Sequence, residues 1–276
     1  MAENTDKLRD VSETMLITVW ARTVETERNG GLIQDPAAVE MLKHIDYDFS
    51  VFDKVTMSQV GCCIRANVMD RQAQTFLDQH PDAVVIQLGA GLDTRYHRLN
   101  CPDITHWYDL DLPEAIDIRR QLCPTHPNNT LLSMSMLEEA WIDTVLAHNK
   151  PVLIICEGVL MYCDEAEVRA FFDMLCQRFE RTTVLFDMLA YMAKGRSKHH
   201  DAVKRTKQKA EFKWSLLNSK DMEQWNDRLH ITEEHYMSDC DNKRFPLLLR
   251  LLYKTSWGYR RLNQRMLRVD INDEGR

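Results

Sequence analysis

Residues 83–95 restrict the possible folds of this chain more than any other stretch. A β-branched run at 84–86 ends in two glycines, Gly89 and Gly91, and Asp93 follows two residues later. Such a run is typical of a buried parallel strand, and the glycines are typical of the tight turn at its carboxyl end. In an α/β sheet this turn is where a nucleotide-like ligand binds.

The glycine turn departs from the three-glycine fingerprint of dinucleotide-binding proteins. Asp93 and Thr94 stand where that fingerprint continues, and no third glycine follows. A carboxylate would disfavour a pyrophosphate here, whereas it would favour a ligand with a cationic amino-acid end, such as S-adenosylmethionine. A nicotinamide-dependent oxidoreductase is therefore an alternative that the turn disfavours, and a purely structural turn also remains open.

A second strand, predicted at 104–108, leads into two aspartates that could bind a ribose. Asp109 and Asp111 follow the glycines by about 20 positions, the spacing at which a carboxylate accepts hydrogen bonds from ribose hydroxyls. One of them could instead cap the helix expected to begin near Pro113. We expect one ligand and one cap, with Asp111 favoured as the ligand.

The composition excludes several classes of protein. A length of 276 residues suits one domain with a full core, and a formal net charge of −7 argues against a nucleic-acid partner. No apolar run is long enough to cross a bilayer and the first ten residues are polar, so we expect a cytoplasmic protein with no membrane partner. The eight cysteines form no Cys-x-x-Cys pair and are interpreted as reduced thiols, not zinc ligands or disulfides.

The rest of the chain alternates between strand and helix patterns. Amphipathic helices at 14–27 and after Asp35 precede the first strand and could close over a ligand. Later strands are predicted at 130–134, 151–156 and 182–187. This alternation predicts an α/β fold in which a parallel sheet carries helices on both faces.

Residues 193–213 break the alternation because they are rich in lysine, arginine and histidine. Such a charge run is usually a solvated helix face, but it could also form a mobile lid whose positive field attracts an anionic acceptor. Trp214 follows directly and is predicted to pack near the pocket mouth. Further along, 231–252 is predicted to be a helix and 253–271 to form two closing strands.

Three motifs, taken together, resemble the leucine carboxyl methyltransferase family. They are Gly89-Ala90-Gly91-Leu92-Asp93-Thr94-Arg95, Asp109-Leu110-Asp111-Leu112-Pro113 and Cys156-Glu157-Gly158-Val159-Leu160-Met161-Tyr162. Segments 11–14, 21–22, 31–36 and 212–214 resemble its bacterial branch, which includes polyketide O-methyltransferases of the tetracenomycin type. The resemblance spans residues 11–226.

The resemblance implies a Rossmann-like class I methyltransferase fold, with a seven-stranded, mostly parallel sheet, N-terminal helices and a helical lid insertion. We predict one domain over 1–276. Its parts would be an N-terminal helical cap (1–64), a cofactor-binding core (65–190), a lid insertion (191–232), and a C-terminal helix with closing strands (233–276).

The resemblance also implies which residues hold the methionine end of S-adenosylmethionine. Arg65 would bind the methionine carboxylate, because a guanidinium forms a bidentate pair with it. Gly89 and Gly91 would let the backbone approach the methionine part. Asp93 and Glu157 would face its amino group or the sulfonium.

The same resemblance places the other end of the cofactor and part of the acceptor pocket. Asp111 would hold the ribose, and Ser135 and Met136 match positions that border the adenine, although Met136 could equally belong to the core. Tyr162 could line the acceptor pocket, although a tyrosine after a buried strand more often packs in the interior.

Methyl transfer from a sulfonium is a direct displacement, which requires alignment of the acceptor oxygen and exclusion of water. A carboxylate acceptor needs no general base, whereas a phenol does. The sequence offers His97, His199 and His200 but no dominant base, which favours an anionic small-molecule acceptor such as a carboxylate. No metal-ligand cluster is visible.

A noncatalytic cofactor-binding subunit remains an alternative, and a monomer and a homodimer are both compatible with the sequence.

Overall fold

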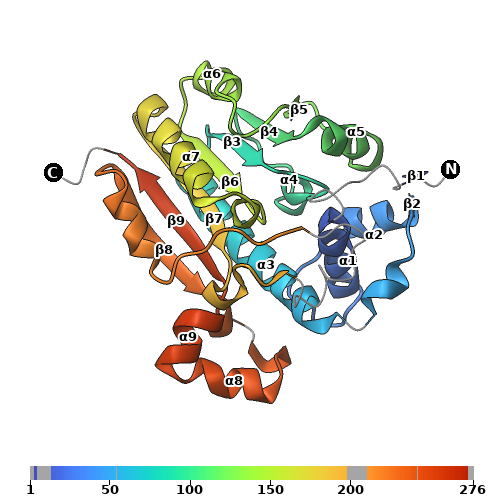
Figure 1. Cartoon of the computed structure of the whole chain (residues 1–276). Helices are drawn as coiled ribbons and strands as arrows, with labels where there is room; N and C mark the ends of the chain where they lie inside the picture. The colour runs from blue at the N-terminus through green and yellow to red at the C-terminus, as the bar shows by residue number, and fades with distance from the viewer. Residues whose placement is uncertain (1–2, 5–13, 54, 198–209, 241, 273–276) are drawn as a thin grey trace.

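The computed structural model describes residues 3–4, 14–53, 55–197, 210–240 and 242–272 and is built around one seven-stranded sheet (Figure 1). The strands are β3 (Val84–Leu88), β4 (His106–Asp111), β5 (Asn129–Ser133), β6 (Val152–Cys156), β7 (Thr182–Met188), β8 (Leu229–Tyr236) and β9 (Arg265–Ile271). Their order is β5-β4-β3-β6-β7-β9-β8, with β9 antiparallel to both its neighbours and the other pairs parallel. The predicted seven-stranded, mostly parallel α/β fold is confirmed.

The order of the strands places a switch point beside β3. The chain moves outward from β3 to β4 and β5, and then returns to the other side of β3 with β6. Loops leaving β3 and β6 therefore diverge at the carboxyl edge of the sheet, which is where open α/β sheets bind ligands.

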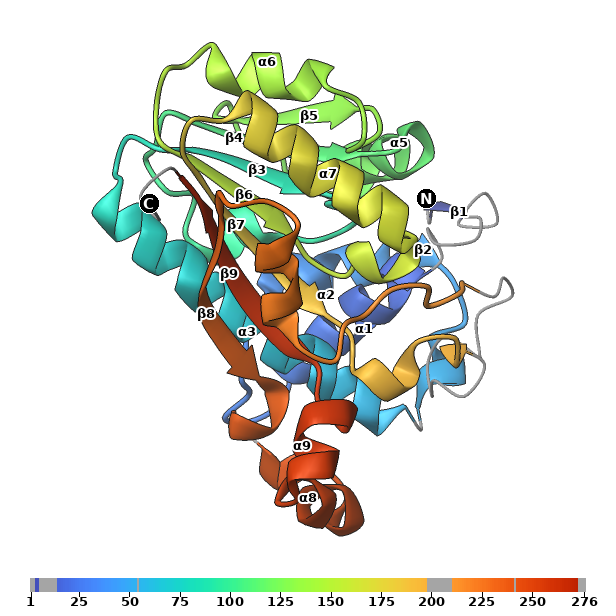
Figure 2. The ribbon, with the colours of Figure 1, turned by 60° about the vertical axis from the view of Figure 1, so that its left-hand side comes forward.

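Helices cover both faces of the sheet because successive residues of its central strand alternate between two apolar clusters. Val84, Ile86 and Leu88 belong to the core that packs against α6 (Ala140–Leu146) and α7 (Glu165–Arg178). Val85 belongs to the core on the opposite face, which packs against α3 (Thr56–Gln79) and α4 (Arg95–Arg98). The helix α5 (Pro113–Leu122) follows β4 near the edge of the sheet (Figures 1 and 2).

The N-terminal helices lie over the carboxyl edge of the sheet (Figure 2). They are α1 (Thr14–Thr26) and α2 (Pro36–Lys43), followed by the 3₁₀ turn η2 (Phe49–Phe52). Asp35 caps α2 by accepting a hydrogen bond from the backbone nitrogen of Ala38 at 3.0 Å. A short parallel pair joins β1 (Glu3–Asn4) to β2 (Ile45–Asp46). Both predicted N-terminal helices are confirmed.

The C-terminal part differs from the sequence-based prediction. Residues 231–252 do not form one helix, because they begin within β8 and continue through the 3₁₀ turns η8 (Met237–Asp239) and η9 (Asn242–Arg244) into α8 (Leu247–Tyr253). Residues 253–271 form α9 (Ser256–Leu262) and a single strand, β9. The edge strand β8 pairs with β9 alone, so its solvent side accepts charged residues such as Glu233 that conceal the strand pattern.

The middle of the predicted lid falls outside the described residues. Its central part, 198–209, includes Lys204, Arg205 and Lys207, on which the structure gives no information. The described flanks contain the 3₁₀ turns η4 (Tyr191–Ala193) and η7 (Ser219–Gln224), and the strand β8 begins before the predicted lid boundary at residue 232. The sheet therefore takes in the last residues assigned to the lid.

No helix within the described ranges is both long and apolar enough to span a membrane. All eight cysteines lie in those ranges and are free thiols.

Candidate active site

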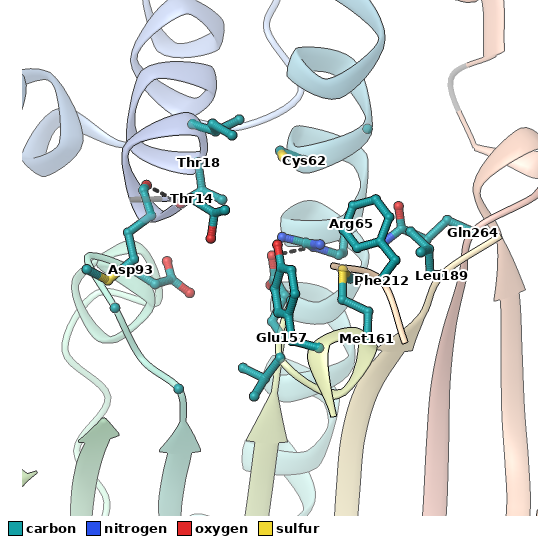
Figure 3. Close-up of a pocket in the computed structure, with 18 of the residues that line it drawn as sticks. Thr14, Thr18, Cys62, Arg65, Asp93, Glu157, Met161, Leu189, Phe212 and Gln264 are labelled. Atoms are coloured by element: carbon teal, nitrogen blue, oxygen red, sulfur yellow. Dashed lines mark hydrogen bonds and ion pairs between the residues drawn. The ribbon is translucent and has the colours of Figure 1, made fainter. Parts of the chain in front are cut away.

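A cavity of about 780 Å³ lies at the carboxyl edge of the sheet, beside the switch point (Figure 3). Its wall includes the turns that follow β3 and β6, the end of β4 and the loop after β5. Side chains from α1 and α3 close the opposite side, so the N-terminal helices contribute directly to the cavity.

The glycine turn after β3 needs glycine for steric reasons. Gly89 has a φ of +63°, and a Cβ at this position would lie 2.2 Å from Cγ2 of Val159. Gly91 has a φ of +48°, and a Cβ there would lie 2.8 Å from Sδ of Met15. The glycine turn therefore packs closely against the turn that follows β6 on one side and against α1 on the other. Its backbone forms part of the cavity wall.

Asp111 ends β4 and lines the cavity beside the glycine turn. Its Oδ2 accepts a hydrogen bond from the Gly91 nitrogen at 2.7 Å, and its Oδ1 accepts one from the Leu112 nitrogen at 2.7 Å. Burial raises the pKa of this carboxyl, and the two backbone donors oppose the rise only in part.

Asp109 does not reach the cavity, although the sequence left it as a possible ligand or cap. Its buried carboxylate accepts hydrogen bonds from Arg119 Nη2 at 2.6 Å, Asn129 Nδ2 at 2.8 Å and Trp107 Nε1 at 3.0 Å. The residue preceding α5 is Leu112, which forms no side-chain cap. Asp109 is thus an internal partner of Arg119, and the prediction that it caps the helix is wrong.

Arg65 projects from α3 into the cavity (Figure 3). Its Nε donates to Glu157 Oε1 at 2.8 Å and its Nη1 to Asp187 Oδ2 at 3.2 Å. Burial alone would lower the pKa of Arg65, but Asp187 and Glu157 hold it well above its usual value. Gly158 gives the guanidinium room, because a Cβ at that position would lie 3.1 Å from Nη2. Among the described residues, these two ion pairs use Nε and Nη1 and do not involve Nη2.

A network of arginines and carboxylates extends behind the glycine turn, and the sequence analysis did not identify it. Asp93 pairs with Arg98, with Arg95 Nη1 at 3.3 Å and with Arg22 Nη1 at 3.9 Å. Burial would raise the pKa of Asp93, but the three arginines outweigh this effect and hold it well below the usual range. Asp93 is therefore ionised at neutral pH.

The network continues from Asp93 to the rest of the predicted site. The buried guanidinium of Arg95 donates to Glu157 and, at 2.7 Å, to Asp70 Oδ1. Its members are Arg22, Arg65, Arg95 and Arg98 together with Asp35, Asp70, Asp93, Glu157 and Asp187. Five carboxylates face four guanidinium groups, so the network carries one excess negative charge.

Gln87 lies on β3 at the floor of the cavity and has an incomplete set of partners. Its Nε2 donates to Asp93 Oδ2 at 2.8 Å, but its buried Oε1 has no hydrogen-bond partner among the described residues. A buried acceptor of this kind needs a donor. The cationic amino group of S-adenosylmethionine could supply it, so the polar floor of the cavity fits the expected cofactor.

The loop after β5 forms another part of the wall, where Ser135 and Met136 both line the cavity. Ser135 Oγ accepts a hydrogen bond from the Leu137 nitrogen at 3.2 Å, and the Met136 side chain is largely buried. These two residues lie on the same wall as Asp111, which agrees with their predicted place beside a nucleoside.

The half of the cavity beyond Arg65 is mostly apolar. Its lining includes Ile17, Met57, Met161, Tyr162, Leu189, Met192, Phe212, Met237, Leu249, Tyr253 and Leu262. The rings of Tyr162 and Phe212 lie 5.8 Å apart, and burial raises the pKa of Tyr162. Tyr162 is therefore a cavity residue, as predicted from the resemblance.

The predicted place of Trp214 is wrong. Its indole is fully buried in the core, 6.4 Å from the rings of both Phe186 and Trp225, and it does not line the cavity. The cavity residue of this segment is Phe212. The backbone nitrogen of Lys213 donates to the Met161 carbonyl at 2.8 Å, which anchors the segment where it passes from the cavity into the core.

The described lining contains no histidine, and each carboxylate in it pairs with arginine or with backbone N–H groups. His97 lies outside the cavity, where its Nε2 is 3.1 Å from the Pro124 carbonyl, and His199 and His200 lie outside the described residues. Within the described part of the chain, no group of three or more potential ligands has a metal-binding arrangement. The described lining thus offers binding and alignment without a free general base.

Comparison with known proteins relates these features to one family. The family model for leucine carboxyl methyltransferase matches residues 15–176. The tetracenomycin polyketide synthesis O-methyltransferase of Streptomyces glaucescens is 32% identical over 235 residues, covering 85% of this chain and 86% of that protein. An S-adenosyl-L-methionine-dependent methyltransferase of Gibberella zeae is 28% identical and covers 64% of each chain. Among solved structures, a DUF574 family protein of Streptomyces avermitilis has a TM-score of 0.55 at 11% identity, covering 93% of this chain and 96% of that one.

Proposed function

The chain belongs to the leucine carboxyl methyltransferase family and is an S-adenosylmethionine-dependent methyltransferase, and we propose that it methylates an anionic oxygen of an apolar small molecule. The observation that carries this proposal is the lining of the cavity, in which polar groups of the strand-end turns meet a mostly apolar set of side chains and the described residues provide no free general base. An aromatic polyketide acid is the acceptor class we favour, because a polyketide O-methyltransferase is among the relatives.

The cofactor supplies a methyl group bonded to a positively charged sulfur. We assign its adenine to the wall formed by Ser135 and Met136 and its ribose to Asp111. Its methionine end would lie over Gly89, with its carboxylate on Nη2 of Arg65. Support for this assignment comes from the lining of the cavity, which includes all of these residues, and from the pairing of Asp111 with Ser133, which brings the ends of β4 and β5 together.

The charge of the network suits the methyl donor better than its product. S-adenosylmethionine carries a net charge of +1 at neutral pH, whereas the demethylated product is neutral. The single excess negative charge behind the glycine turn therefore favours the donor and weakens retention of the product. Because Asp93 and Glu157 are already paired with arginines, the network retains this charge when the cavity is empty.

The acceptor must arrive with its oxygen already ionised, because the described lining provides no free base to remove a proton. A carboxylate meets this requirement at neutral pH. The apolar wall, including Tyr162 and Phe212, would bind the body of the acceptor and exclude water from the reacting atoms. Its methionines have adaptable side chains, which suits an irregular ring system.

A methyl-transfer assay tests this assignment. We expect turnover with aromatic carboxylic acids and none with their preformed methyl esters, which serve as matched controls. The product of a carboxylate acceptor should release methanol in mild base. Cofactor binding by calorimetry, combined with methylation only of nitrogen or carbon acceptors, would contradict the proposal.

Two other features support narrower statements. The eight free thiols suit a reducing compartment, so we propose a cytoplasmic location. A nicotinamide-dependent activity is disfavoured, because Asp93 would repel a pyrophosphate at the turn after β3.

A further inference from the structure

The two short C-terminal helices expose an unusual number of large apolar side chains. We call residues 246–262 the α8–α9 segment. The exposed fractions are 66% for Leu247, 71% for Leu248, 51% for Leu251 and 50% for Trp257. In both views the segment projects from the end of the molecule, away from the helices that cover the sheet (Figures 1 and 2).

The charge of this segment is opposite to that of the whole chain. Residues 242–269 contain eight lysines and arginines and no aspartate or glutamate, although the chain has a formal net charge of −7. Four of these cations, Arg250, Lys254, Arg260 and Arg261, belong to the α8–α9 segment itself. The Arg261 guanidinium lies 6.0 Å from the Trp257 ring, so at least one of these cations lies beside an exposed apolar side chain.

The segment is also part of the cavity wall. Leu249, Tyr253 and Leu262 line the cavity, whereas Leu247, Leu248 and Leu251 are exposed. Residues four apart share one face of a helix, so α8 turns Leu249 and Tyr253 toward the acceptor end and Leu247, Leu248 and Leu251 outward. Whatever covers the exposed face would therefore lie next to the acceptor end of the cavity.

We propose that the α8–α9 segment docks on an anionic phospholipid surface and that the acceptor end of the cavity receives a lipophilic acceptor from that surface. A helical surface that combines leucine and tryptophan with lysine and arginine inserts its apolar side chains below the headgroups while its cations contact lipid phosphates. Outside this segment and the basic stretch at 193–213 the chain is acidic, so an anionic surface favours an orientation in which the α8–α9 segment approaches it. This docking is peripheral, and no spanning helix is involved.

Vesicle sedimentation with the full chain tests the docking. We expect binding to vesicles of phosphatidylcholine mixed with phosphatidylglycerol, little binding to phosphatidylcholine alone, and weaker binding as salt is added. The double variants Leu248→Ser/Leu251→Ser and Lys254→Gln/Arg260→Gln should each lower the vesicle partition coefficient about tenfold or more. Leu146→Ser is the matched control, because Leu146 is an exposed leucine (37%) of α6 on the far side of the sheet, and it should bind like the wild type.

Several results would overturn the docking proposal. They are equal binding to both kinds of vesicle, binding to neither, or unchanged binding of the two double variants. A wild-type dimer that Leu248→Ser/Leu251→Ser converts to a monomer would show instead that a second copy covers the surface.

The statement about the acceptor rests on the proposed function, whereas vesicle binding does not. Methyl transfer to a water-soluble acid without vesicle binding would refute the docking alone. Vesicle binding without methylation of any acid would refute the proposed acceptor alone. Both double variants should retain the wild-type affinity for S-adenosylmethionine, because none of the four replaced residues lines the cavity.

Discussion

Separate alanine variants of Asp109 and Asp111 should have different effects. Asp109→Ala should lower the free energy of unfolding, whereas Asp111→Ala should weaken cofactor binding. The two aspartates lie two residues apart on β4, but only Asp111 lines the cavity. Asp109 holds the buried Arg119 guanidinium at 2.6 Å. The two variants remove the same group from the same strand, so each serves as the control for the other.

The expected magnitudes follow from the surroundings of each carboxylate. Asp109→Ala leaves the Arg119 charge uncompensated in the interior, which costs about 3–5 kcal/mol of the free energy of unfolding. Asp111→Ala removes charge-assisted hydrogen bonds to the ribose, each worth about 1.5–3 kcal/mol, so cofactor binding should weaken about ten- to hundredfold.

Asp111→Ala should leave the free energy of unfolding within about 1 kcal/mol of the wild type. Burial raises the pKa of Asp111, so its ionised form costs stability at any pH above that pKa, and its removal relieves this cost. The relief offsets the loss of the hydrogen bonds from Gly91 and Leu112, whose N–H groups water in the cavity can reach.

Urea unfolding followed by circular dichroism measures the stability, and calorimetric titration with S-adenosylmethionine measures the affinity. The reasoning fails if Asp109→Ala keeps wild-type stability but binds the cofactor poorly. It also fails if Asp111→Ala binds like the wild type.

Three further outcomes follow from the site. Arg65→Lys should weaken cofactor binding nearly as much as Arg65→Ala in calorimetry, because an ammonium lacks the planar fork that pairs with Glu157 and Asp187 while presenting Nη2 to the ligand, and wild-type affinity would show that Arg65 contributes only its charge. Gly89→Ala should lower both the melting temperature and the cofactor affinity, because the added Cβ would clash with Val159. The double variant Gly89→Ala/Val159→Ala should recover part of both quantities. If it recovers neither, the clash with Val159 is not the cause. Cofactor affinity should fall on acidification through the raised pKa of Asp111, since the ionised carboxylate is the acceptor. Asp111→Ala should show a flatter profile below neutral pH, and an unchanged slope would implicate another group.

The sheet and the glycine turn were predictable because their signals are local. The strand Val84–Leu88 is apolar except for Gln87, and Gly89 and Gly91 follow it within three residues, so one window contains both the strand and the turn. Asp111 was also favoured correctly as the aspartate at the cavity, because a parallel neighbour ends at the same edge of the sheet. Its role as a ribose ligand remains a prediction.

The other parts depend on contacts between distant segments. In the sequence, Phe212 and Trp214 are equally plausible pocket residues. The structure distinguishes them, because Trp214 packs against Phe186 in the core while Phe212 lines the cavity. The strand β8 escaped detection because edge strands tolerate charged residues, and its pairing with β9 spans a helical segment. Sequence separation also conceals the ion pair between Arg65 and Asp187, which lie 122 positions apart.

The arginine network also explains why the N-terminal helices can form part of a site that needs close alignment. Arg22 of α1 donates to Asp35 at 2.7 Å and to the Leu92 carbonyl of the glycine turn at 2.9 Å, and Arg98 pairs with Asp35 and Asp93. These buried bonds fix α1 to the turn that borders the cofactor side of the cavity. The helix α1 also supplies residues of the acceptor side of the wall. The charges that favour a cationic methyl donor therefore also fix the position of the acceptor side relative to the cofactor side.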